Sequence, residues 1–264
     1  MSKKDRLEKV ARHVLTREGL SGFTMERLAE AAEVSRPTVY QYFGSREGAL
    51  SATASSTISM CNALFEAALR FQGEPREQAM ALMTGFEVLA RFEPDHLETL
   101  EFLGMPWIKR ALPAPPLEAL QTLVIGFGAR LTALMQLSVE QGQLLLPVGY
   151  PMAAAAFHTQ NFYYGIFFAV ARRRISYDLY GSDRPWEVSR RGLHLYWDGI
   201  GWSPKAGCSD MEVLHDRILR HCFPDYWLRI KTDELKRGLD TPLAEPIPHP
   251  IPEPRRRGRA LKPS

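Results

Sequence analysis

Two short helical patterns joined by a tight turn, within residues 22–43, constrain the fold of this chain more than any other feature. Thr24 is expected to cap the first helix, because a hydroxyl just before a helix accepts a hydrogen bond from one of its free N–H groups. Ser35 is expected to cap the second helix in the same way. Pro37 then falls in the first turn of that helix, where a missing N–H costs nothing. The segment therefore predicts a pair of helices with a tight turn between them.

The apolar residues of this segment predict how the two helices pack. Val34 is placed to fill the turn, and Ala29 is small at the point where the helices must cross closely. Such a pair can present its second helix to the major groove of DNA, which is wide enough to admit one helix. The predicted buried positions are Leu28, Ala29 and Ala32 in the first helix and Val39 and Phe43 in the second.

A third helix is predicted to begin after Ser45, with Arg46 and Glu47 in its first turn. Backbone N–H groups at a helix start, aided by Arg46, can hold a phosphate. From roughly residue 6 to residue 50, the chain resembles the N-terminal domain of the TetR family of bacterial transcriptional regulators. The residues that carry the resemblance are Thr24, Leu28, Ala29, Val34, Ser35, Thr38, Val39, Tyr40, Tyr42, Phe43, Ser45, Arg46, Glu47 and Leu50.

Glu33 departs from the pattern of that family, in which glycine usually holds this position of the turn. A side chain in a left-handed turn conformation costs on the order of 1 kcal/mol. We therefore expect the turn to tolerate Glu33 with a slightly altered shape.

The polar side chains of this domain divide by chemistry into those that read bases and those that hold phosphates. Arg36, Thr38 and Gln41 lie at the start and on the outer face of the second helix, where they are expected to reach base edges. Arginine pairs with guanine and glutamine with adenine, and each pair contributes about 1–3 kcal/mol of discrimination. Contact with a phosphate or with solvent is the alternative for Arg36, and simple packing is the alternative for the two tyrosines. The predicted phosphate contacts are Thr24, Tyr40, Tyr42 and Arg46.

The rest of the chain is predicted to be all-α, because it shows helical periodicity and no alternating strand pattern of useful length. The resemblance implies a three-helix head on a larger helical bundle that binds an effector and dimerises. The predicted domains are the head (1–50), the body (51–205), a helical extension (206–240) and a disordered tail rich in proline and arginine (241–264). The predicted helices beyond the head include 77–92, 95–112, 116–144, 152–175, 185–200 and 210–222.

An effector pocket is predicted from polar side chains on body helices that are otherwise rich in aromatic residues and methionine. A packed core is the alternative for most of these positions. The composition favours a mainly apolar effector, and no cofactor is expected. The candidate pocket residues are His96, Phe102, Trp107, Met135, Gln136, His158, Asn161 and Phe162, with Gln160 as a further polar candidate.

Residues 152–175 and 185–202 are predicted to form the interface of a homodimer. The first segment has small residues at 153–156 followed by aromatic ones, and the second is also rich in aromatic residues. In families of this type such a pair meets its copy in a four-helix bundle. A buried monomer core is the alternative. A dimer would place the two reading helices about 34–36 Å apart, one turn of DNA.

Enzymatic, metal and membrane functions are not expected from this sequence. It has no phosphate-binding glycine loop and no nucleophile elbow, and Cys208, His215, His221 and Cys222 lack the tightly paired spacing of a zinc site. Three cysteines, an odd number, predict reduced thiols rather than a disulfide framework. With no cleavable signal sequence and no apolar run of roughly 18 residues, a cytoplasmic location is expected.

These features predict a regulator that binds a double-stranded DNA operator. A repressor is favoured, released when a small molecule shifts the helix that follows Ser45. The alternative is a DNA-bound protein without an effector, whose helical body recruits a protein partner.

Overall fold

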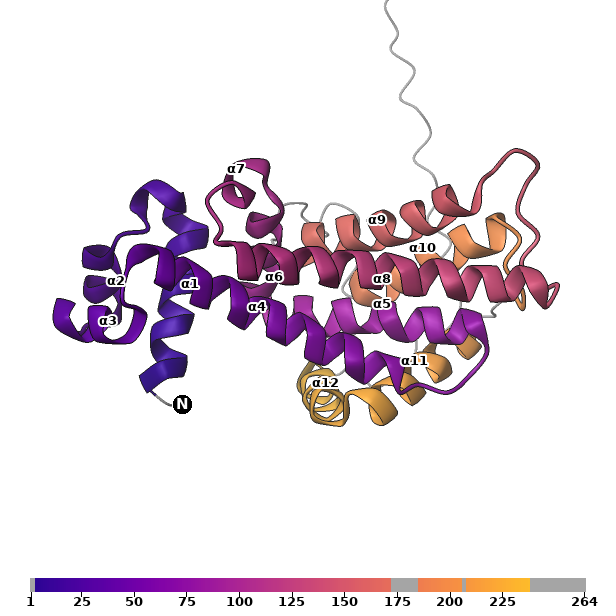
Figure 1. The fold of residues 1–264 in the computed structure, drawn as a ribbon. Coiled ribbons are helices and arrows are strands. Elements are labelled where there is room, and N and C mark those ends of the chain that lie inside the picture. Colours follow the sequence, from indigo (N-terminus) through magenta and orange to yellow (C-terminus); the bar gives the residue numbers. More distant parts are fainter. Residues whose placement is uncertain (1–2, 172–184, 206–207, 238–264) are drawn as a thin grey trace, which may run out of the picture.

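The computed structural model of the chain describes residues 3–171, 185–205 and 208–237, and within them it contains helices and no strand. The predicted tail, residues 241–264, lies outside the described residues. Figure 1 shows a small N-terminal domain at one end of a longer helical body. The prediction of an all-α fold with a helical head and a larger helical bundle is confirmed.

The N-terminal domain, called the head below, consists of α1 (Lys3–Gly22), α2 (Met25–Ala32) and α3 (Arg36–Phe43). Helix α1 bends at Gly19, whose φ of 69° glycine adopts without steric cost. The positions predicted to be buried in α2 and α3 are buried. The core of the head includes Leu7, Ala11, Leu15, Phe23, Leu28, Ala29, Ala32, Val39 and Phe43.

The body is built around α4 (Arg46–Leu69), which starts at the head and runs along the bundle (Figure 1). Helix α4 packs against α5 and α8, and α9 packs against α5, α8 and α10. The α8–α9 connection pairs at Leu144 with Trp202, just after α10. The further body helices are α5 (Pro75–Phe92), α6 (Pro94–Gly104), α7 (Pro106–Lys109), α8 (Ala114–Glu140), α9 (Met152–Ala171) and α10 (Pro185–Gly199).

Residues 95–112, predicted as one helix, form parts of α6 and α7 and the turn after them. The break lies at Pro106, which cannot donate a backbone hydrogen bond and disfavours helical geometry in the residue before it. Met105 accordingly has extended backbone angles, φ −70° and ψ 137°. The chain therefore turns between α6 and α7, and this turn places Lys109 beside the body.

The extension contains α11 (Cys208–Cys222) and α12 (Pro224–Arg237), and α11 packs on α5 and α10. A buried ion cluster joins them: Glu87 of α5, only 1% exposed, lies 2.8 Å from Arg190 of α10 and 3.1 Å from His215 of α11. Burial alone would raise the pKa of Glu87, but the neighbouring positive groups, Arg190 first, hold it well below its ordinary value. This cluster anchors the extension to the body.

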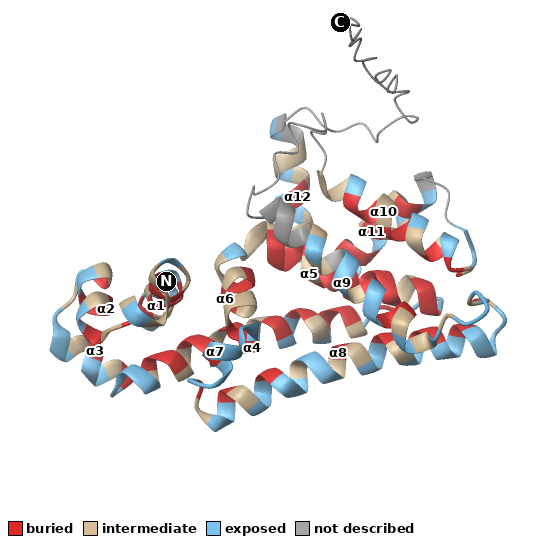
Figure 2. Cartoon of the chain, turned by 90° about the horizontal axis from the view of Figure 1, so that it is seen from above, coloured by how far each residue is buried: buried red, intermediate tan, exposed pale blue. Residues whose placement is uncertain are grey.

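Among the described helices, α8 is long and apolar enough to cross a membrane by length and composition alone. It packs against α4, α5 and α9 within the bundle. Figure 2 shows buried positions alternating with exposed ones along it. The bundle covers only one face of α8: 28% of its most apolar stretch is buried, and Val124 and Ile125 are 51% and 69% exposed.

Candidate functional site

Local side-chain caps determine where the helices of the head begin. The hydroxyls of Thr24, Ser35 and Ser45 each accept a hydrogen bond from the backbone N–H three residues later, at 3.1, 3.4 and 3.0 Å. All three caps were predicted and are confirmed. Because each cap is made by a residue next to its helix, this part of the geometry is encoded locally.

Glu33 holds the turn between α2 and α3 in the left-handed conformation, with φ 53° and ψ 45°. Its N–H and that of Val34 donate to carbonyls of the last turn of α2, both at 3.0 Å, which is the usual arrangement at a left-handed helix end. Arg6 of α1 donates to the last carbonyl of α2 at 2.9 Å and reaches the Glu33 carboxylate at 3.4 Å. The turn thus tolerates Glu33 in a left-handed conformation, as expected.

The outer face of α3 carries polar side chains that are available to an external partner. The side chain of Arg36 is 66% exposed and pairs with Glu26 of α2 at 3.6 Å, while Tyr40 is 47% exposed. Gln41 is exposed, and the partly exposed Thr38 shares a 2.9 Å hydrogen bond with the capping hydroxyl of its own helix. This face therefore combines donors, acceptors and an aromatic ring on a short rigid helix.

Two residues predicted to hold phosphates have partners inside the head. The hydroxyl of Tyr42 donates to Glu8 of α1 at 2.8 Å, and burial together with this bond raises the pKa of Tyr42 to about 12. Arg46 donates from Nε to the Phe23 carbonyl at 2.7 Å and from Nη2 to the Leu20 carbonyl. Both side chains therefore connect the helices of the head, a role that depends on residues far away in the sequence.

Polar contacts join the head to the body. Arg12 of α1 donates to the Ser56 hydroxyl of α4 at 3.0 Å, and Thr57 of α4 lies 3.1 Å from Nδ1 of His96 on α6. Burial, and then the charge of Arg12, lowers the pKa of His96 to about 4. Helices α1, α4 and α6 thus meet at one junction, which is buried although it is polar.

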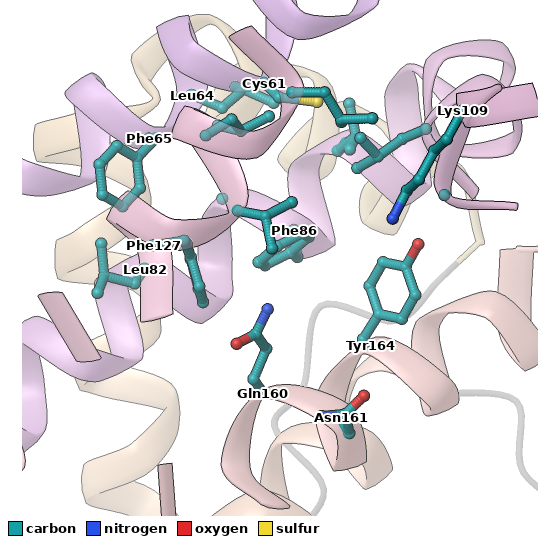
Figure 3. Close-up of a pocket in the computed structure, with 17 residues that line it drawn as sticks. Cys61, Leu64, Phe65, Leu82, Phe86, Lys109, Phe127, Gln160, Asn161 and Tyr164 are labelled. Atoms are coloured by element: carbon teal, nitrogen blue, oxygen red, sulfur yellow. The ribbon is translucent and has the colours of Figure 1, made fainter. Parts of the chain in front are cut away.

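A cavity of about 280 Å³ lies in the body between α4, α5, α8 and α9, with α6 and α7 at one end (Figure 3). Cys61 lies in its wall, and burial raises the pKa of this thiol to about 12, so the wall is neutral there. Lys109, Gln160, Asn161 and Tyr164 are its long polar side chains. The apolar lining consists of Cys61, Leu64, Phe65, Leu82, Phe86, Leu89, Leu100, Leu120, Leu123, Val124 and Phe127, with Gly85 and Gly104.

Residues 8–53 match the sequence model of the bacterial regulatory proteins of the tetR family. This match covers the head of the chain and not its body. The head is therefore the DNA-binding domain of a transcriptional regulator, and proteins of this family typically bind their operators as dimers. No curated protein matches this chain by sequence.

The fold of this chain is shared by solved structures of low sequence identity. PfmR of Thermus thermophilus is 20% identical with a TM-score of 0.56, over 75% of this chain and 96% of that one. The ketosteroid transcriptional regulator KstR2 of Mycobacterium tuberculosis is 14% identical with a TM-score of 0.59, over 76% and 96%. A tetR-family regulator from Rhodococcus is 16% identical with a TM-score of 0.58, over 77% and 100%. These likenesses show the fold.

Of the eight predicted pocket residues, only Asn161 lines the cavity of the body. His96 lies in the junction with the head, and Met135 is fully buried in the core. Phe102 and Trp107 contact each other edge to face, with ring centroids 4.9 Å apart. These positions looked like pocket residues because aromatic, methionine and buried polar side chains occur in cores and junctions as well.

The other three candidates also lie away from the cavity lining. Gln136 is exposed on α8 and bonds to Glu140 at 3.2 Å. His158 hydrogen-bonds to Tyr150, and Phe162 stacks on Tyr196 with centroids 6.0 Å apart. Gln160, the further polar candidate, does line the cavity, whereas Lys109 and Tyr164 were not singled out. No local pattern marks Lys109, because the break at Pro106 places it there.

No group of three or more histidine, cysteine, aspartate or glutamate side chains within the described residues is placed to hold a metal ion. His215, considered as a ligand, lies 3.1 Å from Glu87 in the buried ion cluster. The side chain of Cys208 lies outside the described residues. The ion cluster therefore accounts for His215 without a metal.

Proposed function

We propose that this regulator represses transcription from a DNA operator and is released when a mainly apolar molecule enters the cavity of its body. The observation that carries the proposal is the course of α4. Near its start, Ala49, Leu50 and Ala54 belong to the core of the head, whereas Cys61 and Phe65 further along form a wall of the cavity. One continuous helix therefore connects the candidate DNA-reading and ligand-binding regions.

The exposed face of α3 supports direct reading of bases by the head. Arg36, Thr38 and Gln41 supply the donors and acceptors that base edges require, and Tyr40 is exposed enough to reach a phosphate. Thr24 is the remaining candidate for a phosphate contact, at the start of α2. In this proposal Tyr42 and Arg46 act mainly by holding the helices in place.

Helix α6 supports a second connection between the cavity and the head. Leu100 and Gly104 of this helix line the cavity, and the ring of Phe102 lies 3.9 Å from where a side chain at Gly19 of α1 would begin. A molecule that fills the cavity would press on α4 and α6 together. Displacement of these helices would change the position of the head, and coupling of this kind is typically worth about 1–3 kcal/mol.

The outer faces of α9 and α10 support the predicted homodimer. Phe157 and Phe162 of α9 are 61% and 39% exposed, and Val188 and Leu195 of α10 are 43% and 70% exposed. Exposed apolar side chains gathered on neighbouring helices are typical of an interaction surface. The alternative, a body that recruits a different protein, is less well supported because it gives the cavity no role.

The proposed DNA contact is tested with an operator selected from random double-stranded DNA by the purified protein. We expect Arg36→Ala to weaken binding to the selected operator about tenfold to a hundredfold in fluorescence anisotropy, with a much smaller effect on random DNA. Arg220→Ala is the matched control. Like Arg36, Arg220 is exposed (62%) and paired with a carboxylate, but it lies on α11. Equal losses on both DNAs would contradict base reading by Arg36.

Repression is tested by placing the selected operator across the promoter of a reporter gene. We expect the wild-type chain to lower expression and Arg36→Ala to restore it at the same protein level. A rise in expression with the wild-type chain would show activation and overturn the proposed repressor.

A further inference from the structure

We propose that the cavity takes an amphiphile with an acidic head group, whose carboxylate is held by Lys109. This inference rests on the proposed function only in treating the cavity as the ligand site. It adds the charge of the ligand and the direction in which the ligand lies.

The cavity lining has one charge, and that charge is positive. Lys109 is the only ionisable cation among the lining residues, and none of them is aspartate or glutamate. Within the described part of the chain, no ion pair involves Lys109, whereas Arg76, Arg91 and Arg190 of the body each pair with a carboxylate. A ligand that brings a negative charge would supply the missing partner.

The polar and apolar parts of the lining lie at different ends of the cavity. Figure 3 shows the Lys109 amino group and the Tyr164 hydroxyl on the same side of the cavity, with the Gln160 amide between this side and Phe127. Phe65 and Phe127 lie at the opposite side of the view. The cavity therefore matches a molecule that has one polar end and a longer apolar part.

Hydrogen-bond donors exceed acceptors at the polar end. The Lys109 ammonium group offers three donors, and no hydrogen bond joins the Gln160 amide to another described residue. The Asn161 amide already donates a hydrogen bond to the Phe157 carbonyl at 2.8 Å. A carboxylate only accepts hydrogen bonds and carries the complementary charge, so it fits this end better than a hydroxyl or an amine.

The apolar walls favour the same assignment. An ion pair at the edge of an apolar chamber is screened less than one in open water, and charge-assisted hydrogen bonds are stronger than neutral ones. Lys109 is exposed at the edge, so the acid head would remain partly solvated while the apolar part is buried. A cationic head group would meet repulsion at this position.

Three probes with the same apolar chain test the charge: decanoic acid, decanol and decylamine. Their affinities for the full-length protein are measured by isothermal titration calorimetry at neutral pH, below the concentrations at which they aggregate. We expect the acid to bind about tenfold more tightly than the alcohol, and the amine to bind most weakly. Raising the salt concentration should reduce the advantage of the acid.

Substitutions of Lys109 test whether this residue is the source of the preference for the acid. Lys109→Met should remove the preference for the acid and leave the affinity for decanol unchanged, and Lys109→Glu should make decylamine the preferred probe. Arg110→Met is the matched control, because Arg110 is the neighbouring exposed cation and does not line the cavity. Leu123→Trp, which fills the cavity from α8, should weaken all three probes.

The outcomes separate this inference from the proposed function. The inference is overturned if the acid binds no more tightly than the alcohol, if no probe binds, or if the preference survives in Lys109→Met. Operator binding is measured in parallel with saturating decanoic acid. If the acid binds through Lys109 while operator affinity stays constant, the inference stands and the proposed release of the operator fails.

Discussion

The head and the body of this regulator differ in where their candidate functions lie. The head has a filled core, and its polar side chains stand on the outside of α3. The body encloses a cavity whose lining comes from residues between Cys61 and Tyr164. A binding surface on one short helix consists of residues that are close together in the sequence. A binding site inside a bundle depends on side chains that the fold brings together from distant segments. The difference explains why DNA binding is easier to recognise in the sequence than ligand binding.

The two regions also differ in how they use charge. Charged side chains of the head are mainly exposed, as in the Arg36–Glu26 pair. The body buries charge in the cluster around Glu87 and again where Arg76, 4% exposed, meets Asp198 at 2.7 Å. Buried pairs are costly to break, because removing one partner leaves an uncompensated charge out of water. The body should therefore be far more sensitive than the head to neutralising a single charge.

The largest expected effect is the loss of the Glu87 carboxylate. Glu87→Gln should lower the free energy of unfolding by about 3–5 kcal/mol, because Arg190 and His215 lose the buried carboxylate that they share, while Arg190 keeps Glu212 at 2.7 Å. Glu77→Gln is the control, since its pair with Arg217 is partly exposed and should contribute about 1 kcal/mol or less. Urea unfolding followed by circular dichroism measures both. Equal effects of the two substitutions would remove the distinction between buried and exposed charge.

The sequence predicted the helices, caps and buried positions of the head, because their decisive signals are local. The caps at Thr24, Ser35 and Ser45 and the turn at Glu33 each act within a few residues. The partner of Tyr42 was not predictable, since Glu8 lies on another helix. In the body, the sequence pattern of an apolar residue in the core is the same as that of an apolar residue in a cavity wall, so the sequence does not distinguish the two. The position of Lys109 depended on how the chain turns after Pro106, which no periodicity specifies.

A smaller effect is expected from pH, through buried histidines. Burial first, then nearby positive charge, lowers the pKa of His96 to about 4 and that of His194 to about 3. Both side chains are therefore neutral in the folded state and take up a proton more readily when unfolded. Stability should be complete above the unfolded pKa of about 6.5 and should fall on the order of 2 kcal/mol as the pH drops from there toward 4.

The midpoint of urea unfolding, measured across this pH range, checks the expectation. His96→Gln, which can keep a hydrogen bond to Thr57, should weaken the pH dependence, whereas His13→Gln on the exposed face of α1 should not. A pH dependence that is the same in both variants would mean that the junction between head and body does not contribute.

The smallest expected effect concerns the turn of the head. Glu33→Gly should stabilise the protein by about 0.5–1 kcal/mol, because glycine adopts the left-handed conformation without steric cost. Operator affinity should be unchanged, since the turn already has the required geometry. A thermal unfolding scan and an anisotropy titration measure the two quantities. Loss of operator affinity would show instead that the Glu33 side chain takes part in the DNA-binding face.

The central claim, that the cavity controls the head through α4 and α6, can be tested without any ligand. Leu123 lines the cavity, whereas Ile125, two residues along the same helix, is 69% exposed. Operator affinity is measured by anisotropy for Leu123→Trp and Ile125→Trp, after circular dichroism shows that both are folded. The account predicts that filling the cavity in Leu123→Trp weakens operator binding at least about fivefold, while Ile125→Trp binds like the wild type. Wild-type affinity in both folded variants would contradict it.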